Sequence, residues 1–173
     1  IINFGQFIPA WDSSYFPLLL TRPVTMKNYL EAKAMLMYGS ILILTILSTP
    51  YAFFGWDKVY MNMACAIYNA GINIPIILLF GAYNKKYIDL SNGSMFNYQG
   101  IGAAQWLIGL PLLIIPIVIW FTVKVFADQN VANRVLIGCG VIGLLLRNVI
   151  MNSLVALYMH NRFRMLEGFK QKS

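Results

Sequence analysis

Ionisable residues are so sparse and so clustered in this sequence that they mark where the chain can leave an apolar solvent. Residues 34–56, 59–84 and 90–123 contain no Asp, Glu, Lys or Arg, and residues 135–159 contain only Arg147. A helix needs about 20 apolar residues to cross the roughly 30 Å hydrocarbon core of a bilayer. Hydrocarbon offers no water to pair backbone groups, so continuous apolar runs of this length predict helices. We therefore expect four membrane-spanning helices, over residues 34–56, 59–84, 101–123 and 135–159.

The composition excludes a water-soluble globular domain. Hydrophobic residues make up 59% of the 173 positions and charged residues 11%, whereas about 25% of the residues in an average soluble domain are charged. Residues 1–11 carry no charge either, and a signal peptide would need a basic segment that is missing here. We expect an all-α integral membrane protein with four complete transmembrane helices, preceded by the end of a further transmembrane helix at residues 1–11.

The basic residues predict which ends of these helices face the cytoplasm. If residues 12–33 are cytoplasmic, four crossings place residues 85–100 and the basic tail 160–173 on the same side, with nine Lys and Arg there and three on the other side. Cytoplasmic segments carry an excess of Lys and Arg, so the C-terminus is expected to be cytoplasmic. Topology and anionic lipid headgroups then explain the net charge of +7. Nucleic acid is not expected as a partner.

Polar side chains recur at helical spacing inside two of the expected spans. The amides are Asn62, Asn69 and Asn73 in the second span, and Asn148 and Asn152 in the last span. Such residues usually face the bundle interior or a water-filled cavity. Two interpretations remain open: hydrogen bonds between helices, or the lining of a substrate path or a mobile subunit interface. The neighbouring Arg147 needs a partner or water, because an unpaired charge at mid-span costs at least about 2.5–3.5 kcal/mol.

Three further motifs are interpreted as structural. Residues 138–143 match the dinucleotide-binding pattern GxGxxG, but this pattern is meaningful only between a strand and a helix, so close helix packing through small residues is the better explanation. Cys65 and Cys139 lie inside apolar spans and are expected to be packing residues rather than a disulfide or metal pair. Pro111 and Pro116 should kink the third span or break it into two pieces.

No set of residues suggests catalysis. Every acidic residue lies at or beyond a membrane boundary, and the single histidine, His160, sits at the cytoplasmic end of the last span, where contact with headgroups is expected. Neither metal ligation nor acid/base catalysis is therefore expected. The chain is predicted to have no catalytic residues, no metal and no cofactor.

Residues 12–33 are expected to form a cytoplasmic segment with a short amphipathic helix. Asp12 and the two serines after it offer capping oxygens for a helix over residues 15–20, and Pro23 ends that helix at the preceding residue. Thr25 can cap a second helix that runs on into the first span.

This segment resembles the one that follows the second transmembrane helix of ABC-2 type exporter permeases. In those permeases an acidic residue precedes a short helix with a Leu-Leu-Leu run, a small residue, x-Pro-[Val/Ile]-[Ser/Thr], and a Lys that opens the third transmembrane helix. The matching residues here are Asp12, Leu18, Leu19, Leu20, Thr21, Pro23, Val24, Thr25 and Lys33. The motif match covers residues 11–33, and the layout of the helices is similar over the whole chain. More narrowly, the sequence resembles a branch of these permeases found in Bacteroidota, which implies a bacterial inner (plasma) membrane.

The resemblance implies that residues 12–22 form the coupling helix, which docks on the ATPase subunit. The residues implied at that interface are Asp12, Tyr15, Leu18, Leu19, Leu20, Thr21, Arg22 and Pro23. The chain would supply the end of the second and all of the third to sixth transmembrane helices of a six-helix permease. ATP would be hydrolysed by a separate subunit, because the chain contains no GxxxxGK[ST] loop.

The implied partners are this ABC ATPase subunit, membrane lipids and a second permease, as a homodimer or pseudo-dimer. The implied function is export coupled to ATP hydrolysis, with a substrate that the sequence does not identify. The alternative is a non-transporting membrane scaffold or assembly subunit, in which residues 12–33 merely lie on the bilayer surface. An intramembrane enzyme is disfavoured by the missing acids and histidines.

Overall fold

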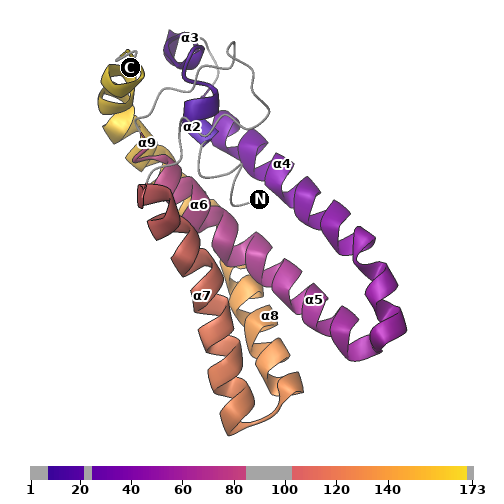
Figure 1. Cartoon of the computed structure of the whole chain (residues 1–173). Helices are drawn as coiled ribbons and strands as arrows, with labels where there is room; N and C mark the ends of the chain where they lie inside the picture. The colour runs from indigo at the N-terminus through magenta and orange to yellow at the C-terminus, as the bar shows by residue number, and fades with distance from the viewer. Residues whose placement is uncertain (1–7, 22–24, 85–102, 171–173) are drawn as a thin grey trace.

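The computed structural model describes residues 8–21, 25–84 and 103–170, except the side chains of Pro9, Trp11 and residues 103–108. Within these ranges every regular element is a helix (Figure 1). The elements are α2 (Ile8–Trp11), α3 (Phe16–Thr21), α4 (Met26–Leu47), η1 (Thr49–Phe54), α5 (Trp56–Tyr68), η2 (Asn69–Asn73), α6 (Ile74–Gly81), α7 (Ala103–Phe126), α8 (Gln129–Leu145) and α9 (Arg147–Lys170). Outside the described part lie residues 1–7 of the expected leading helix, the predicted coupling residues Arg22 and Pro23, the expected cytoplasmic loop 85–100 and the last residues of the tail, 171–173.

Three helices are long and apolar enough to cross a membrane, judged by length and composition. They are Met26–Leu47, Trp56–Gly81 and Gly109–Phe126, and the bent pair α8 and α9 makes a fourth if it counts as one span. The chain is therefore all-helical with three to four candidate spans, as a multi-pass membrane protein requires.

The long helices run between two ends of the molecule (Figure 1). The first end, which we call the α3 end, brings together α3, the start of α4 and the C-terminal part of α9. The connections from α4 to α5 and from α7 to α8 lie at the other end, which we call the turn end. The described parts of the segments 12–33 and 160–173 thus share one end of the bundle.

Local chemistry explains where α4 begins and ends. The Thr25 hydroxyl accepts a backbone N–H of the first turn at 3.2 Å, so the predicted cap is confirmed. The helix ends at Leu47, and η1 follows with Pro50 in its first turn and Gly55 after it at φ 116°. The prediction that the first span reaches Trp56 is wrong, as is a connection at residues 56–58, because Pro50 has no N–H to continue α4 and Gly55 adopts a left-handed conformation.

The second span is one helical rod with a wider turn in its middle. α5 continues into η2, a π-helical turn in which the Ile74 N–H donates to the Asn69 carbonyl, and then into α6. Pro75 sits in the first turn of α6 and cannot donate to the carbonyl four residues earlier. A π-turn is one of the ways in which a helix accommodates such a lost hydrogen bond.

The third span is continuous through its prolines. α7 runs from Ala103 to Phe126 with both Pro111 and Pro116 inside it, so of the two predicted outcomes the break into two pieces is excluded and the kink stays a prediction. Pro116 has no N–H for the Leu112 carbonyl, but Asn73 Nδ2 lies 3.2 Å from that carbonyl oxygen. A side chain from a neighbouring helix therefore replaces the donor that the proline removes.

The break occurs instead in the last expected span. α8 and α9 are bent by 62° on either side of Leu146, so the expected span over residues 135–159 is interrupted near its middle. No proline or glycine occupies the break. α8 packs against α5, η2 and α7, whereas α9 packs against α4 and α6. The bend therefore lets α8 and α9, which are consecutive in the chain, pack against different helices.

Candidate functional site

At the α3 end, Asp12, which lies between α2 and α3, forms an ion pair and a hydrogen bond with residues of α4. Its Oδ2 atom lies 2.7 Å from Lys33 Nζ and accepts the Tyr29 hydroxyl at 2.6 Å. Lys33 Nζ also lies 5.4 Å from the centre of the Tyr29 ring. The carboxylate and the ammonium are both largely shielded from solvent, at 25% and 17% exposure. Charge-assisted hydrogen bonds in such surroundings are stronger than those between exposed groups.

A buried aromatic pair fastens the same segment to α9. The Phe16 and Phe169 ring centroids are 5.4 Å apart and the rings are nearly perpendicular, at 81°. Both side chains are buried, and an edge-to-face pair adds about 0.5–1.5 kcal/mol to the burial of its area. Sequence reasoning missed Phe16, although its spacing from Leu19 and Leu20 places all three on one face of a helix.

The predicted coupling residues of α3 separate onto two faces. Tyr15 and Leu18 are 63% and 52% exposed. Leu19 and Leu20 are half-buried and pack against the main hydrophobic core. Thr21 is exposed, and its hydroxyl donates to the Leu18 carbonyl at 3.1 Å. One apolar face of α3 is therefore available to a partner, while the other holds the helix on the bundle.

One residue of the polar face of the second span, Asn73, contacts α7. Asn73 is buried and donates through Nδ2 to Asn69 Oδ1 at 2.6 Å and to the Leu112 carbonyl at 3.2 Å. Asn62 of α5, which lies seven residues before Asn69, is half-buried. For Asn73 these contacts agree with the interpretation as a hydrogen bond between helices.

The polar residues of the last span are not brought into the interior. Asn148 and Asn152 are exposed, because α9 buries the face that carries Met151, Leu154 and Tyr158. Arg147 stands at the first turn of α9, with its guanidinium 5.6 Å from the centre of the Tyr38 ring of α4. The aromatic ring is thus a partner for the guanidinium, which the sequence alone did not identify.

Three polar contacts between helices were missed by the sequence reasoning. The Tyr158 hydroxyl donates to the Leu78 carbonyl at 2.9 Å, and Asn161 Nδ2 donates to the Ala82 carbonyl at 3.3 Å. Trp120 Nε1 donates to Asn133 Oδ1 at 2.8 Å, which joins α7 to α8. The Asn161 bond reaches the carbonyl of Ala82, just past the end of α6, where a helix leaves carbonyls without internal donors. The Tyr158 bond adds to the 3.3 Å bond that the Ala82 N–H makes to the Leu78 carbonyl.

Small residues let α8 approach the second span closely, as predicted. A Cβ atom on Gly140 would lie 2.5 Å from the Ile67 carbonyl oxygen, and one on Gly143 would collide with the backbone at Gly71. Gly138 faces open space, so it takes no part in this contact. The glycine pattern is therefore a helix-packing surface at two of its three positions.

The described residues contain no group of three or more His, Cys, Asp or Glu side chains that could hold a metal ion. Cys65 and Cys139 are free thiols.

Comparison with known proteins places the chain in a family. No curated protein and no solved structure matches it. One family model matches residues 1–172, and its description is a family of unknown function, DUF5687. Since the match covers nearly the whole sequence, this chain belongs to the DUF5687 family.

Proposed function

We propose that this chain is the membrane-spanning permease subunit of an ABC-2 type exporter in a bacterial inner membrane, with α3 as its coupling helix. The observation that carries the proposal is the exposed apolar face of α3, formed by Tyr15 and Leu18, on a helix that is tied to two long helices. An exposed tyrosine and leucine at the tip of a bundle suit a contact with another protein subunit.

Two sets of contacts connect α3 to the bundle. The ion pair between Asp12 and Lys33 and the Tyr29 hydrogen bond join it to α4. The ring pair of Phe16 and Phe169 joins it to α9. Movement of an ATPase subunit against α3 would therefore push on α4 and α9 together. Through the break at Leu146, that push would continue into α8.

The orientation follows from charge. In this proposal the α3 end faces the cytoplasm, because it carries Lys27, Arg162, Arg164 and Lys170, and basic residues gather on the cytoplasmic side of membrane proteins. The C-terminus is then cytoplasmic as well.

The exposed amides Asn148 and Asn152 support a second permease subunit in the assembly. They lie on the outer face of α9, where an amide against lipid would be left without a hydrogen-bond partner. In the proposal a second copy of the permease covers this face and supplies donors and acceptors.

The test is affinity purification of the tagged full-length protein from its native membrane. We expect an ATPase with a Walker A loop to co-purify. Leu18→Asp should lower its recovery by about tenfold or more, because burying an unpaired carboxylate in an interface costs more than the roughly 1.4 kcal/mol that corresponds to tenfold.

Phe53→Asp is the matched control, because Phe53 is an equally apolar, 93% exposed position at the turn end. It should leave the recovery unchanged. Unchanged recovery with Leu18→Asp would show that α3 is not the coupling helix. The lack of any ATPase in the purified material would contradict the permease proposal and favour a non-transporting membrane scaffold.

A further inference from the structure

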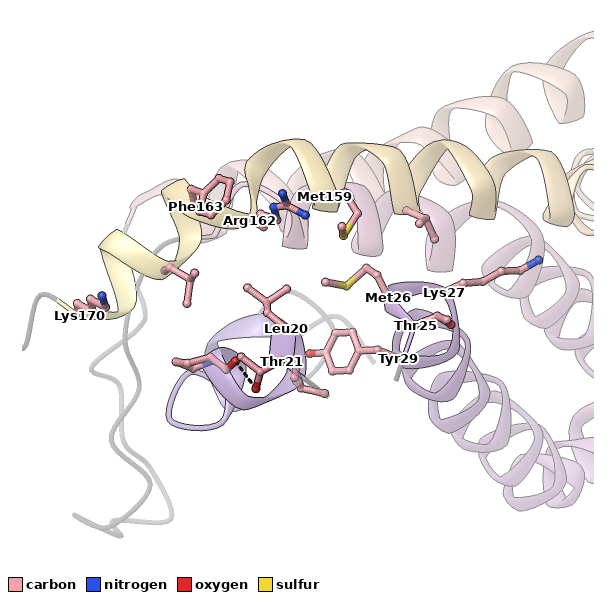
Figure 2. A pocket seen from close by; sticks show the side chains of 14 residues that line it. Leu20, Thr21, Thr25, Met26, Lys27, Tyr29, Met159, Arg162, Phe163 and Lys170 are labelled. Atoms are coloured by element: carbon pink, nitrogen blue, oxygen red, sulfur yellow. Dashed lines mark hydrogen bonds between the residues drawn. The ribbon is translucent and has the colours of Figure 1, made fainter. Parts of the chain in front are cut away.

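A groove lies between α3, the first turns of α4 and the C-terminal half of α9 (Figure 2). Its volume is about 770 Å³, within the range of roughly 300–1,000 Å³ that is typical of sites for small molecules. Leu20 and Met26 point into it from one side and Met159 lies across from them on α9. The side of α3 that lines it is the inner one, opposite the exposed Tyr15 and Leu18.

The charges along this groove are all positive. Lys27, Arg162 and Lys170 line it, and no Asp or Glu is among the described residues of its wall. Asp12, the acidic residue beside α3, is already engaged by Lys33 and Tyr29. Figure 2 shows Lys27 and Lys170 toward opposite ends of the groove and Arg162 between them, so an anion in the groove would meet positive charge and no carboxylate in the wall.

Arg162 lines this groove, and its guanidinium lies 4.6 Å from the centre of the Phe163 ring, which is not an anionic partner. Its Nε atom is buried and has no hydrogen-bond partner within the part of the chain that the structure describes. A buried donor without an acceptor is unfavourable, and guanidinium groups pair best with carboxylate or phosphate oxygens. Arg162 thus favours a ligand that brings an anionic oxygen into the groove.

The apolar wall and the position in the molecule narrow the ligand further. The groove lies where the candidate span Met26–Leu47 begins, which is the level of the lipid headgroups. We propose that the groove binds an anionic phospholipid, with its phosphate at Arg162 and the upper part of one acyl chain along Leu20, Met26 and Met159. A phospholipid with two chains is larger than the groove, so the rest of it stays in the bilayer.

This site does not depend on the proposed export function. It would couple lipid composition to the position of α3, because the lipid would touch α3 on one side and α9 on the other. A lipid-filled groove should hold α3 in place more firmly than an empty one.

The experiment measures lipid binding to the full chain in a zwitterionic detergent by native mass spectrometry. The probes are phosphatidylglycerol, phosphatidylcholine and inorganic phosphate. We expect phosphatidylglycerol to bind at least about tenfold more tightly than phosphatidylcholine, since basic residues attract anionic headgroups. The double variant Lys27→Gln and Arg162→Gln should lose this preference.

Two variants keep the proposal open to refutation. Lys124→Gln with Arg134→Gln removes the same charge from exposed positions on α7 and α8, and it should leave phosphatidylglycerol binding unchanged. Met159→Trp keeps the charge but fills the groove, and it should weaken binding of phosphatidylglycerol by about tenfold, because the acyl chain loses its place. Retention of the native elution volume by each variant shows that it is folded.

Three results would overturn the proposal. Equal binding of phosphatidylglycerol and phosphatidylcholine would exclude recognition of the anion. Equal weakening by the Lys124 and Arg134 variant would mean general attraction to a basic protein. Displacement of the lipid by millimolar inorganic phosphate would identify a site for soluble phosphate. All three measurements use purified protein without an ATPase. A result that overturns the lipid site therefore does not bear on the permease proposal.

Discussion

Two helices pack against the η2 turn of the second span by opposite means. α8 approaches through its backbone, and a Cβ atom on either Gly140 or Gly143 would meet backbone atoms of the second span. α7 approaches through a side chain, because the Asn73 amide donates to the Leu112 carbonyl at 3.2 Å. The contact with α8 requires glycines, which have no side chain, whereas the contact with α7 requires the amide side chain of Asn73.

The difference determines how each contact should respond to mutation. Backbone atoms in close contact have no alternative rotamer, so an added methyl group must move two helices apart. A side-chain amide can be replaced if another donor reaches the same carbonyl. We therefore expect the contact with α8 to be disrupted by any added side-chain atom. In the contact with α7, we expect that another donor can replace the Asn73 amide.

The largest expected effect comes from Gly140→Ala. The new Cβ would lie 2.5 Å from the Ile67 carbonyl oxygen, and overpacking of this kind costs about 1–3 kcal/mol. Gly138→Ala is the matched control on the same helix, because Gly138 has nothing within 4 Å of the added atom. The free energy of unfolding in mixed detergent micelles, measured by SDS titration, gives both values. Equal stability of the two variants would contradict the close backbone contact.

A smaller effect is expected for Asn73→Leu, which keeps the approximate volume and removes the donor to Leu112. Polar contacts between membrane helices average about 0.6 kcal/mol and reach about 1.7 kcal/mol. Pro116→Ala should restore most of this loss, because the alanine that replaces the proline has an N–H for the Leu112 carbonyl.

SDS titration of the two single variants and of the double variant measures whether the alanine N–H replaces the Asn73 amide as the donor to Leu112. Pro116→Ala should be more favourable in the Asn73→Leu background than in the wild-type chain. Pro111→Ala is the control, because Pro111 does not remove the donor to Leu112, and it should rescue nothing. Additive effects of Asn73→Leu and Pro116→Ala would mean that the two donors do not serve one carbonyl.

The all-helical, membrane-spanning character could be predicted because it depends on composition over windows of about 20 residues. The break beside Leu146 could not, since it arises where α8 and α9 pack against different neighbours and no breaker residue marks it. The continuity of α7 through Pro116 could not be predicted either, because Asn73 of another helix supplies the donor that the proline removes. Tertiary contacts therefore decided both cases against local sequence signals.

The candidate site was predictable only in part, for a similar reason. The run Leu18 to Leu20 marked an amphipathic helix, but the neighbours of α3 determine that Leu18 is exposed while Leu20 is half-buried. Tyr158 and Asn161 could not be identified as contacts, because their acceptors are backbone carbonyls at the end of α6, about 80 positions earlier in the chain. Backbone acceptors leave no pattern in the sequence.

The proposed topology requires α3 and the end of α9 to lie on the same, cytoplasmic side of the membrane. Single cysteines at Thr21, Lys170, Phe53 and Asn130, in a chain with Cys65→Ala and Cys139→Ala, can be labelled with a membrane-impermeant maleimide. Thr21→Cys and Lys170→Cys should react only in inside-out vesicles, and Phe53→Cys and Asn130→Cys only in spheroplasts. Labelling of Thr21→Cys and Lys170→Cys from opposite sides would contradict the four crossings and the permease proposal that depends on them.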